Sequence, residues 1–388
     1  MTTSNDSGTS SGDRFTSDRA DGRFVESVAW LHSVYRDWRP KLAFDPEMKA
    51  GEFDAWRDAV QVKLRELMTL PTPPPQPEPV MVSREPREGY ELQKWEAYPE
   101  PGLVAPYLVL VPGGVIEASP ASAVMCFPGS ASSKESMAGE PESDGSTPLK
   151  MQHWERNRMA LRYAREGIVA VAVDNPGIGE LSSALVPERH ELSVNAIWLG
   201  RSYEGLTVST KLPILEWLKA QPHVDAERIA TSGHSLGAKP ALIIGALDRS
   251  IRAVVWNDFC SDWRERAVAM NLGRISIHQY VPGFLEWFDY TDLLASLAPR
   301  PLVITEGGRT RDIEVIRGAY ELLGAGDQIE VAYYPKFADP SAREFEDVDM
   351  PEGLDFDEYF RYANVDVAEH SFKHEVAVPW LKRQLAAG

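Results

Sequence analysis

The chain has 388 residues, of which 43% are hydrophobic and 25% are charged. These values are ordinary for a globular protein, and the length favours one large domain with additions to it. The formal net charge is −18. A chain this acidic repels phosphate backbones, so we do not expect nucleic acid as a partner.

The N-terminal residues 1–22 are mostly Ser, Thr, Gly and Asp, and a segment with so little to bury is predicted to be disordered. It lacks the basic start and apolar run of a signal peptide, and no later apolar run reaches membrane-spanning length. We therefore expect a cytoplasmic protein. Cys126 and Cys260 form no C-x-x-C pattern, which argues against a disulfide framework or a zinc ribbon.

A helical prefix is predicted over residues 23–70, because 24–38 and 53–67 both space their apolar residues by three and four. The sequence PTPPPQPEP at 71–79 then ends the prefix as a stiff linker. We expect the main domain to occupy 80–388.

Within the main domain, strands and helices alternate with regular gaps. Apolar runs such as IVAVAVD at 168–174 are typical of strands buried on both faces, and a helix is predicted at 151–167. The fold class expected is α/β, a doubly wound, mostly parallel sheet with antiparallel strands at its N-terminal end. Two long segments, 259–298 and 336–369, interrupt the alternation and are predicted to be lid-like insertions.

The sequence ERIATSGHSLGAKPALIIGAL predicts a strand, a tight turn and a helix, with Ser235 on the turn. Gly233 and Gly237 flank the serine where bulky side chains would clash. This context is typical of a nucleophile elbow, on which the serine is exposed and the amide of Leu236 points toward a developing oxyanion. A serine in an ordinary loop is the alternative, which the strand–turn–helix context disfavours.

A base and an acid are expected to accompany the serine. His370 lies between the last strand and the last helix, where the chain order serine, acid, histidine places the base, and His374 is its nearby competitor. Glu306 at a strand end is the favoured acid. Asp312 is an alternative, although it could serve the dipole of a helix capped by Thr310, and Asp258 at the end of another strand is a third.

The loop PGSASSKES, which follows the strand at 123–127, is expected to supply the second oxyanion donor through the amide of Ser130. Gly129 would let its backbone approach a substrate closely. A plain Pro-Gly turn is the alternative. Neither a metal nor an organic cofactor is expected: His370 and His374 lack an H-E-x-x-H pattern and a third ligand.

From about residue 90 onward, the chain resembles α/β-hydrolases of the dienelactone-hydrolase and acetyl-xylan-esterase-like branch, and more distantly glucuronoyl esterases. The stretches that carry the resemblance are FPGSASSKE, VAVDNPGIGE, WLKAQPHVDAERIATSGHSLGAKPAL, LAPRPLVITEGG and AEHSFKHEVAVPWL. The resemblance implies Ser235 as nucleophile, His370 as base, and the Leu236 and Ser130 amides as the oxyanion hole. Arg309 and Thr310 stand where relatives often carry the acid, which keeps three acid candidates open.

The function expected is hydrolysis of a carboxylic ester of a small acyl, sugar or aryl group through an acyl-enzyme. The alternatives are cleavage of an amide or carbon–carbon bond by the same residues, and a non-catalytic binding protein that keeps the fold. Aromatic residues at 259–298 could bind a sugar or an aryl group, or form the small core of a lid. We expect a small-molecule ester as partner and no membrane, and a homo-oligomer stays open.

Overall fold

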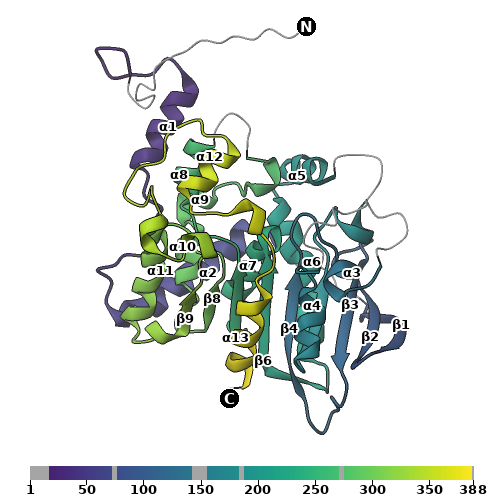
Figure 1. Cartoon of the computed structure of the whole chain (residues 1–388). Helices are drawn as coiled ribbons and strands as arrows, with labels where there is room; N and C mark the ends of the chain where they lie inside the picture. Colours follow the sequence, from purple (N-terminus) through teal and green to yellow (C-terminus); the bar gives the residue numbers. More distant parts are fainter. Residues whose placement is uncertain (1–16, 72–76, 142–154, 183–187, 271–274, 387–388) are drawn as a thin grey trace.

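The structure is a computed structural model that describes residues 17–71, 77–141, 155–182, 188–270 and 275–386. A single nine-stranded sheet runs through its centre in the order β1-β2-β3-β5-β4-β6-β7-β8-β9 (Figure 1). The strands are β1 Val80–Arg87, β2 Tyr90–Ala97, β3 Ala105–Pro112, β4 Ala121–Phe127, β5 Val169–Val173, β6 Val224–His234, β7 Ala253–Asn257, β8 Leu302–Ile304 and β9 Ile329–Val331.

The strands alternate in direction from β1 to β5 and then keep one direction through the rest of the sheet. The pairs β1–β2, β2–β3 and β3–β5 are antiparallel, and all pairs from β5 through β4 to β9 are parallel. The carboxyl ends of the parallel strands therefore meet at one edge, which is where α/β sheets place their ligands. The predicted α/β fold with antiparallel N-terminal strands is confirmed.

Helices cover both faces of the sheet. The helices of the described residues are α1 Ser27–Asp37, α2 Phe53–Leu67, α3 Lys134–Ala138, α4 Met159–Arg165, α5 Glu188–Trp198, α6 Tyr203–Lys219, α7 Ala238–Leu247, α8 Trp263–Ala269, α9 Phe284–Trp287, α10 Tyr290–Ala295, α11 Thr310–Leu322, α12 Phe356–Tyr362 and α13 His374–Ala386. None of them combines the length and the apolar content that crossing a membrane requires.

The central strand β4 shows why both faces must be covered. Val124 and Cys126 point into one buried apolar cluster, which includes residues of α4 and α13. Met125 and Phe127 point into the other, which includes residues of α2, α6 and α7. Successive side chains of a strand alternate between faces, so a continuous apolar run needs helices on both.

The prefix predicted at 23–70 packs onto 259–298, the first of the two predicted insertions; 336–369 is the second. The backbone N–H of Leu42 donates to the carbonyl of Trp287 at 2.6 Å, and that of Phe44 donates to the Asp292 carboxylate at 2.8 Å. The second insertion packs on the first as well, since Tyr359 belongs to the same buried apolar cluster as Phe259. α1, α8 and α12 of these segments lie side by side beyond one end of the sheet (Figure 1), whereas α2 and α10 pack in the apolar cluster on one of its faces.

Two predictions of local structure were wrong in part. The helix expected over 151–167 is α4, which starts only at Met159; residues 155–157 form a turn and 151–154 lie outside the described residues. Thr310 is the first residue of α11 rather than its cap, and its N–H donates instead to a Glu346 carboxylate oxygen at 2.9 Å. Most of the predicted N-terminal tail, 1–16, and the centre of the Pro-rich linker, 72–76, also lie outside the described residues.

Candidate active site

The turn that carries Ser235 is formed by close backbone contacts that only glycine allows. β6 ends at His234 and the short 3₁₀ helix η3, Ser235–Gly237, leads directly into α7. A Cβ on Gly233 would lie 2.0 Å from the carbonyl oxygen of Gly237, and one on Gly237 would lie 2.2 Å from that of Phe127. The two glycines are therefore required by the turn itself.

Ser235 holds the left-handed backbone conformation that this turn needs, with φ of +52°. For a residue with a side chain this conformation is costly, by about 1–2 kcal/mol. Such strain persists where the surrounding structure enforces it, and it is common at functional positions. The side chain of Ser235 remains partly exposed at the carboxyl edge of the sheet, while Leu236 beside it is buried.

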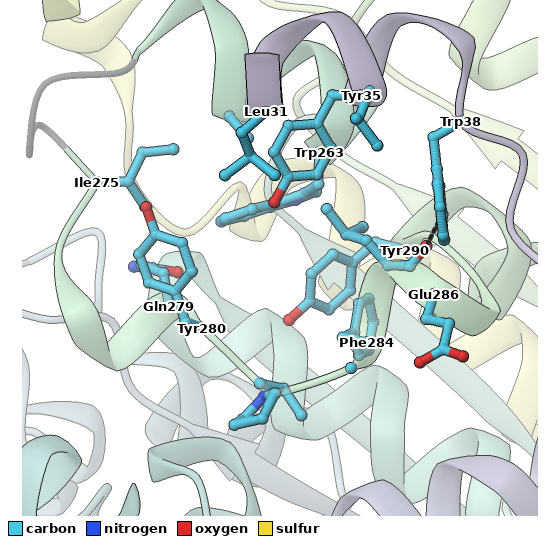
Figure 2. A pocket seen from close by; sticks show the side chains of 16 residues that line it. Leu31, Tyr35, Trp38, Trp263, Ile275, Gln279, Tyr280, Phe284, Glu286 and Tyr290 are labelled. Atoms are coloured by element: carbon cyan, nitrogen blue, oxygen red, sulfur yellow. Dashed lines mark hydrogen bonds between the residues drawn. The ribbon is translucent and has the colours of Figure 1, made fainter. Parts of the chain in front are cut away.

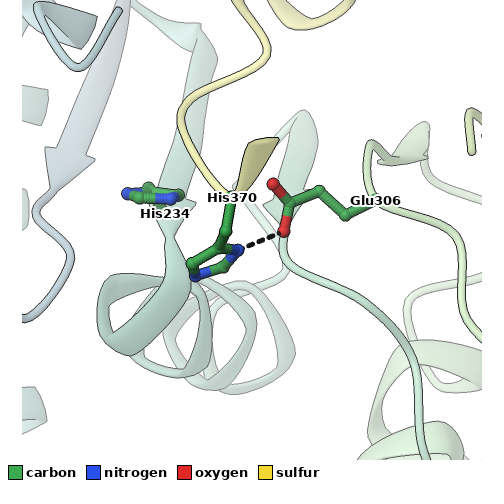
Figure 3. Close-up of side chains that lie close together, drawn as sticks. All are labelled: His234, Glu306 and His370. Carbon is green, nitrogen blue, oxygen red and sulfur yellow. Dashed lines mark hydrogen bonds and ion pairs between the residues drawn. The ribbon is translucent and has the colours of Figure 1, made fainter. Parts of the chain in front are cut away.

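The structure brings His370 and Glu306 together from segments far apart in the sequence. His370 Nδ1 lies 2.7 Å from Glu306 Oε2 (Figure 3). The Glu306 side chain is fully buried, whereas that of His370 is 26% exposed. The imidazole also reaches the elbow, since its ring centroid lies 4.9 Å from that of His234, the residue before Ser235.

The pair shifts the pKa values of both groups. Burial alone lowers the pKa of His370, but the negative charge and the hydrogen bond of Glu306 outweigh it and raise the pKa to about 9. Burial likewise raises the pKa of Glu306, but the charge and hydrogen bond of His370 bring it below its ordinary value. Glu306 is thus a carboxylate that stabilises the protonated imidazole.

The other two acid candidates are engaged elsewhere. The Asp312 carboxylate accepts a hydrogen bond from the backbone N–H of Asp262 at 3.1 Å, and burial raises its pKa to about 7. The Asp258 carboxylate accepts from the N–H of Phe259 at 2.9 Å, and burial raises its pKa to about 6. Of the three candidates, Glu306 is the one hydrogen-bonded to His370.

Two further side chains surround the pair, and sequence reasoning missed both. The phenol oxygen of Tyr334, just after β9, lies 3.4 Å from His370 Nδ1, and the Lys373 ammonium lies 3.4 Å from Glu306 Oε1. Burial and the charge of Glu306 raise the pKa of the Tyr334 phenol, so it keeps its proton. Only the motif IEVAYYP and the proximity of Lys373 to His370 in the sequence could have indicated them.

His234, Glu306 and His370 also offer possible metal-ligand atoms within 4.8 Å of one another. The Nδ1 atom of His370 already faces Glu306, so an ion held by this nitrogen and this carboxylate would replace their hydrogen bond. We therefore interpret the cluster as a hydrogen-bonded histidine–carboxylate pair beside the elbow.

The loop with the predicted second oxyanion donor packs directly on the elbow. A Cβ on Gly129 would lie 2.8 Å from His234 Nδ1, so this position needs a glycine. Ser130 follows it and is exposed. The carbonyl of Pro128 accepts a hydrogen bond from Asn175 Nδ2 at 2.9 Å, which fixes the start of the loop.

A buried charge cluster fixes the end of the same loop. Lys134 is fully buried, and its ammonium lies 3.0 Å from Asp174 Oδ2, 2.7 Å from a Glu180 oxygen and 2.6 Å from a Glu135 oxygen. Its backbone N–H donates to the other Asp174 oxygen at 2.6 Å. The loop is thus held at both ends, which keeps backbone donors in place.

Arg309, at the position where the resemblance led us to expect an acid, has a structural role. It is fully buried, and its guanidinium lies 3.0 Å from a Glu265 carboxylate oxygen. It also donates to the backbone carbonyls of Phe345, Glu346 and Val348 at 3.1, 3.0 and 2.6 Å. Arg309 therefore ties the second insertion to α8 in the first.

Comparison with known proteins agrees with this architecture. Residues 10–383 match the model of the abhydrolase family. A Bacteroides fragilis protein described as a "putative acetyl xylan esterase" is 38% identical, with a TM-score of 0.87 over 95% of this chain and 97% of that one.

More distant matches support the fold alone. Methylesterase BT1017 is 17% identical with a TM-score of 0.56, over 92% of this chain and 78% of that one. A glucuronoyl esterase from Solibacter usitatus is also 17% identical, with a TM-score of 0.51 over 70% of this chain and 82% of that one. The Bacillus subtilis "putative hydrolase YtaP" is 28% identical over 160 residues, which are 41% of this chain and half the length of that relative.

Proposed function

The chain belongs to the abhydrolase family, and from that premise we propose that it hydrolyses carboxylic esters with Ser235 as nucleophile, His370 as general base and Glu306 as the acid. The observation that carries the proposal is the strained elbow beside a histidine–carboxylate pair, with 2.7 Å between His370 Nδ1 and Glu306 Oε2. The Bacteroides fragilis neighbour, described as a "putative acetyl xylan esterase", supports the same reaction class.

In the acylation step, Ser235 Oγ attacks the carbonyl carbon of the ester as His370 takes the hydroxyl proton. Glu306 stabilises the imidazolium that forms. The oxyanion of the tetrahedral intermediate accepts hydrogen bonds from the Leu236 and Ser130 amides, each worth about 3 kcal/mol of barrier. The carbon–oxygen bond to the alcohol then breaks, and the alcohol leaves with the proton from His370.

In the deacylation step, the same groups act on water. His370 removes a proton from the water molecule as it attacks the acyl-enzyme, and returns that proton to Ser235 Oγ as the acid product leaves. These residues supply a base, an orienting carboxylate and backbone donors, which are the groups that ester hydrolysis needs.

The proposal is tested with a fluorophosphonate probe and a short-chain aryl ester. Wild-type protein is expected to be labelled and to hydrolyse the ester, whereas Ser235→Ala loses both and His370→Ala loses most of the rate. An exposed serine outside the site, as in Ser250→Ala, serves as the matched control. Folded wild-type protein that neither reacts with the probe nor hydrolyses esters would contradict the proposal, and an unaltered Ser235→Ala rate would do so equally.

A further inference from the structure

A cavity of about 450 Å³ lies between the N-terminal helix α1 and the first insertion (Figure 2). Its walls are dominated by aromatic rings, which come from both segments: Tyr35, Trp38, Trp263, Tyr280, Phe284 and Tyr290. Sequence reasoning left open whether the aromatic residues of the insertion bind a ligand or form the core of a lid. The structure gives them both roles: Phe284, Phe288 and Tyr290 are buried in one core cluster, and Phe284 and Tyr290 also line the cavity.

The wall formed by the prefix is firmly attached. Trp38 Nε1 donates to the carbonyl of Leu285 at 2.8 Å, and Arg264 donates to the carbonyl of Trp38 at 2.6 Å. The backbone N–H of Lys41 also donates to the carbonyl of Glu286 at 3.0 Å. The two segments that form the cavity wall are therefore held to each other by hydrogen bonds.

Besides the tyrosine hydroxyls, the wall carries three polar side-chain groups that are engaged within the protein. The Gln279 amide contacts Lys239 and His278, and the Glu286 carboxylate pairs with Lys41. The indole N–H of Trp38 is used by Leu285. The rest of the wall that a ligand would contact is chiefly ring faces and aliphatic carbon. Such a surface favours an uncharged, flat, apolar group.

Lys239 connects the cavity to the elbow. It lies four residues after Ser235, in the first turn of α7, and is buried. Its ammonium lies 4.0 Å from the ring centroid of Trp263 and 5.0 Å from that of Tyr290, both in the cavity wall. Lys239 thus contacts two rings of the cavity wall from the helix that begins directly after the Ser235 turn.

We propose that this cavity binds an uncharged aromatic group, and that this group belongs to the ester that Ser235 cleaves. The second half of this inference rests on the proposed function. A volume of about 450 Å³ is within the range of small-molecule sites and accommodates a fused two-ring system. A charged group would lose its hydration there, because Glu286, the one charged side chain among the described wall residues, is already paired with Lys41.

Binding is tested first, with 2-naphthol as the probe and titration calorimetry as the measurement. One molecule is expected to bind per chain. Ala267→Phe places a ring into the cavity from α8 and should weaken binding about tenfold or more, and Tyr280→Ala, which removes a half-exposed wall residue, should also weaken it. Val62→Phe adds the same ring on the exposed side of α2 and should leave binding unaltered.

The substrate role is tested with three esters of primary alcohols: ethyl acetate, 2-(2-naphthyl)ethyl acetate and ethyl 3-(2-naphthyl)propanoate. At least one aromatic ester should exceed ethyl acetate about tenfold in kcat/KM. Ala267→Phe should remove that advantage, whereas Val62→Phe should keep both the advantage and the rate on ethyl acetate.

The outcomes separate the two proposals. Ser235-dependent hydrolysis without naphthol binding, or without an aromatic advantage, would overturn the inference and leave the proposed function intact. Naphthol binding that Ala267→Phe weakens, in a protein that hydrolyses no ester, would overturn the proposed function and leave the aromatic site standing.

Discussion

Lys373 and His370 lie on opposite sides of the Glu306 carboxylate: the Lys373 ammonium is 3.4 Å from Oε1, and His370 Nδ1 is 2.7 Å from Oε2. The two neighbours shift the pKa of the His370 imidazole in opposite directions. The negative charge of Glu306 raises the pKa of His370, while the positive charge of Lys373 lowers it. The pH dependence of activity should therefore respond differently to the loss of each.

We predict that kcat/KM rises with pH through the raised pKa of His370, because the proposed mechanism uses the neutral imidazole as the base. In Lys373→Met the loss of the positive charge raises that pKa, so the rise moves to higher pH by about half a unit.

The measurement is a pH–rate profile of kcat/KM with a short-chain aryl ester. Lys382→Met, which removes a lysine paired with Glu166 at the surface, is the control and should not move the profile. A shift to lower pH in Lys373→Met would contradict the assignment.

A second prediction separates the three acid candidates. Glu306→Gln keeps the shape of the side chain but removes the charge that orients and stabilises the imidazolium, so kcat/KM should fall by about 10³–10⁴. It should also move any residual pH–rate rise to lower pH, because the pKa of His370 falls.

Asp312→Asn is the matched control, since Asp312 bonds to the Asp262 backbone instead of to His370. Its rate should stay within about threefold of wild type, and Asp258→Asn should lie between the two because Asp258 affects His370 only through its charge. A loss in Asp312→Asn equal to that in Glu306→Gln, at unaltered thermal stability, would exclude Glu306 as the single acid.

The sheet and the elbow could be predicted because local patterns specify them. β4, β5 and β7 are continuous apolar runs, and the glycines around Ser235 are required by contacts within a few residues of the turn or with the adjacent strand end. The α4 prediction was wrong in part because a helical period continues into residues that the structure forms as a turn. Periodicity does not fix where a helix begins.

The surroundings of the site could not be predicted, since they depend on contacts between distant segments. Tyr334 lies 36 residues from His370, and Arg309 reaches backbone carbonyls about as far along the chain. No local motif indicates that a buried arginine takes the place where relatives often carry an acid. The cavity wall likewise needs α1 and the first insertion, which are separated by more than 200 residues.

A third prediction concerns Arg309. Arg309→Met leaves three backbone carbonyls and part of the Glu265 carboxylate without their buried donor, so the free energy of unfolding should fall by about 3–5 kcal/mol. Urea unfolding measures this, and limited proteolysis should show faster cleavage within 336–369. Arg311 pairs with the same glutamate but is 42% exposed, so Arg311→Met should cost less than about 1 kcal/mol. Equal losses in the two variants would contradict the anchoring role of Arg309.

The last prediction uses the backbone strain at Ser235. Both Ser235→Ala and Ser235→Gly remove the hydroxyl and should abolish hydrolysis. Only glycine relieves the left-handed conformation at φ of +52°. That relief is worth about 1–2 kcal/mol, and the greater freedom of glycine in the unfolded chain offsets about 0.5–1 kcal/mol of it. Ser235→Gly should therefore have a free energy of unfolding higher than that of Ser235→Ala by up to about 1.5 kcal/mol, measured from urea midpoints at equal slope. If Ser235→Ala is the more stable of the two, the turn does not strain Ser235, and the elbow would lose the feature that distinguishes it from an ordinary loop.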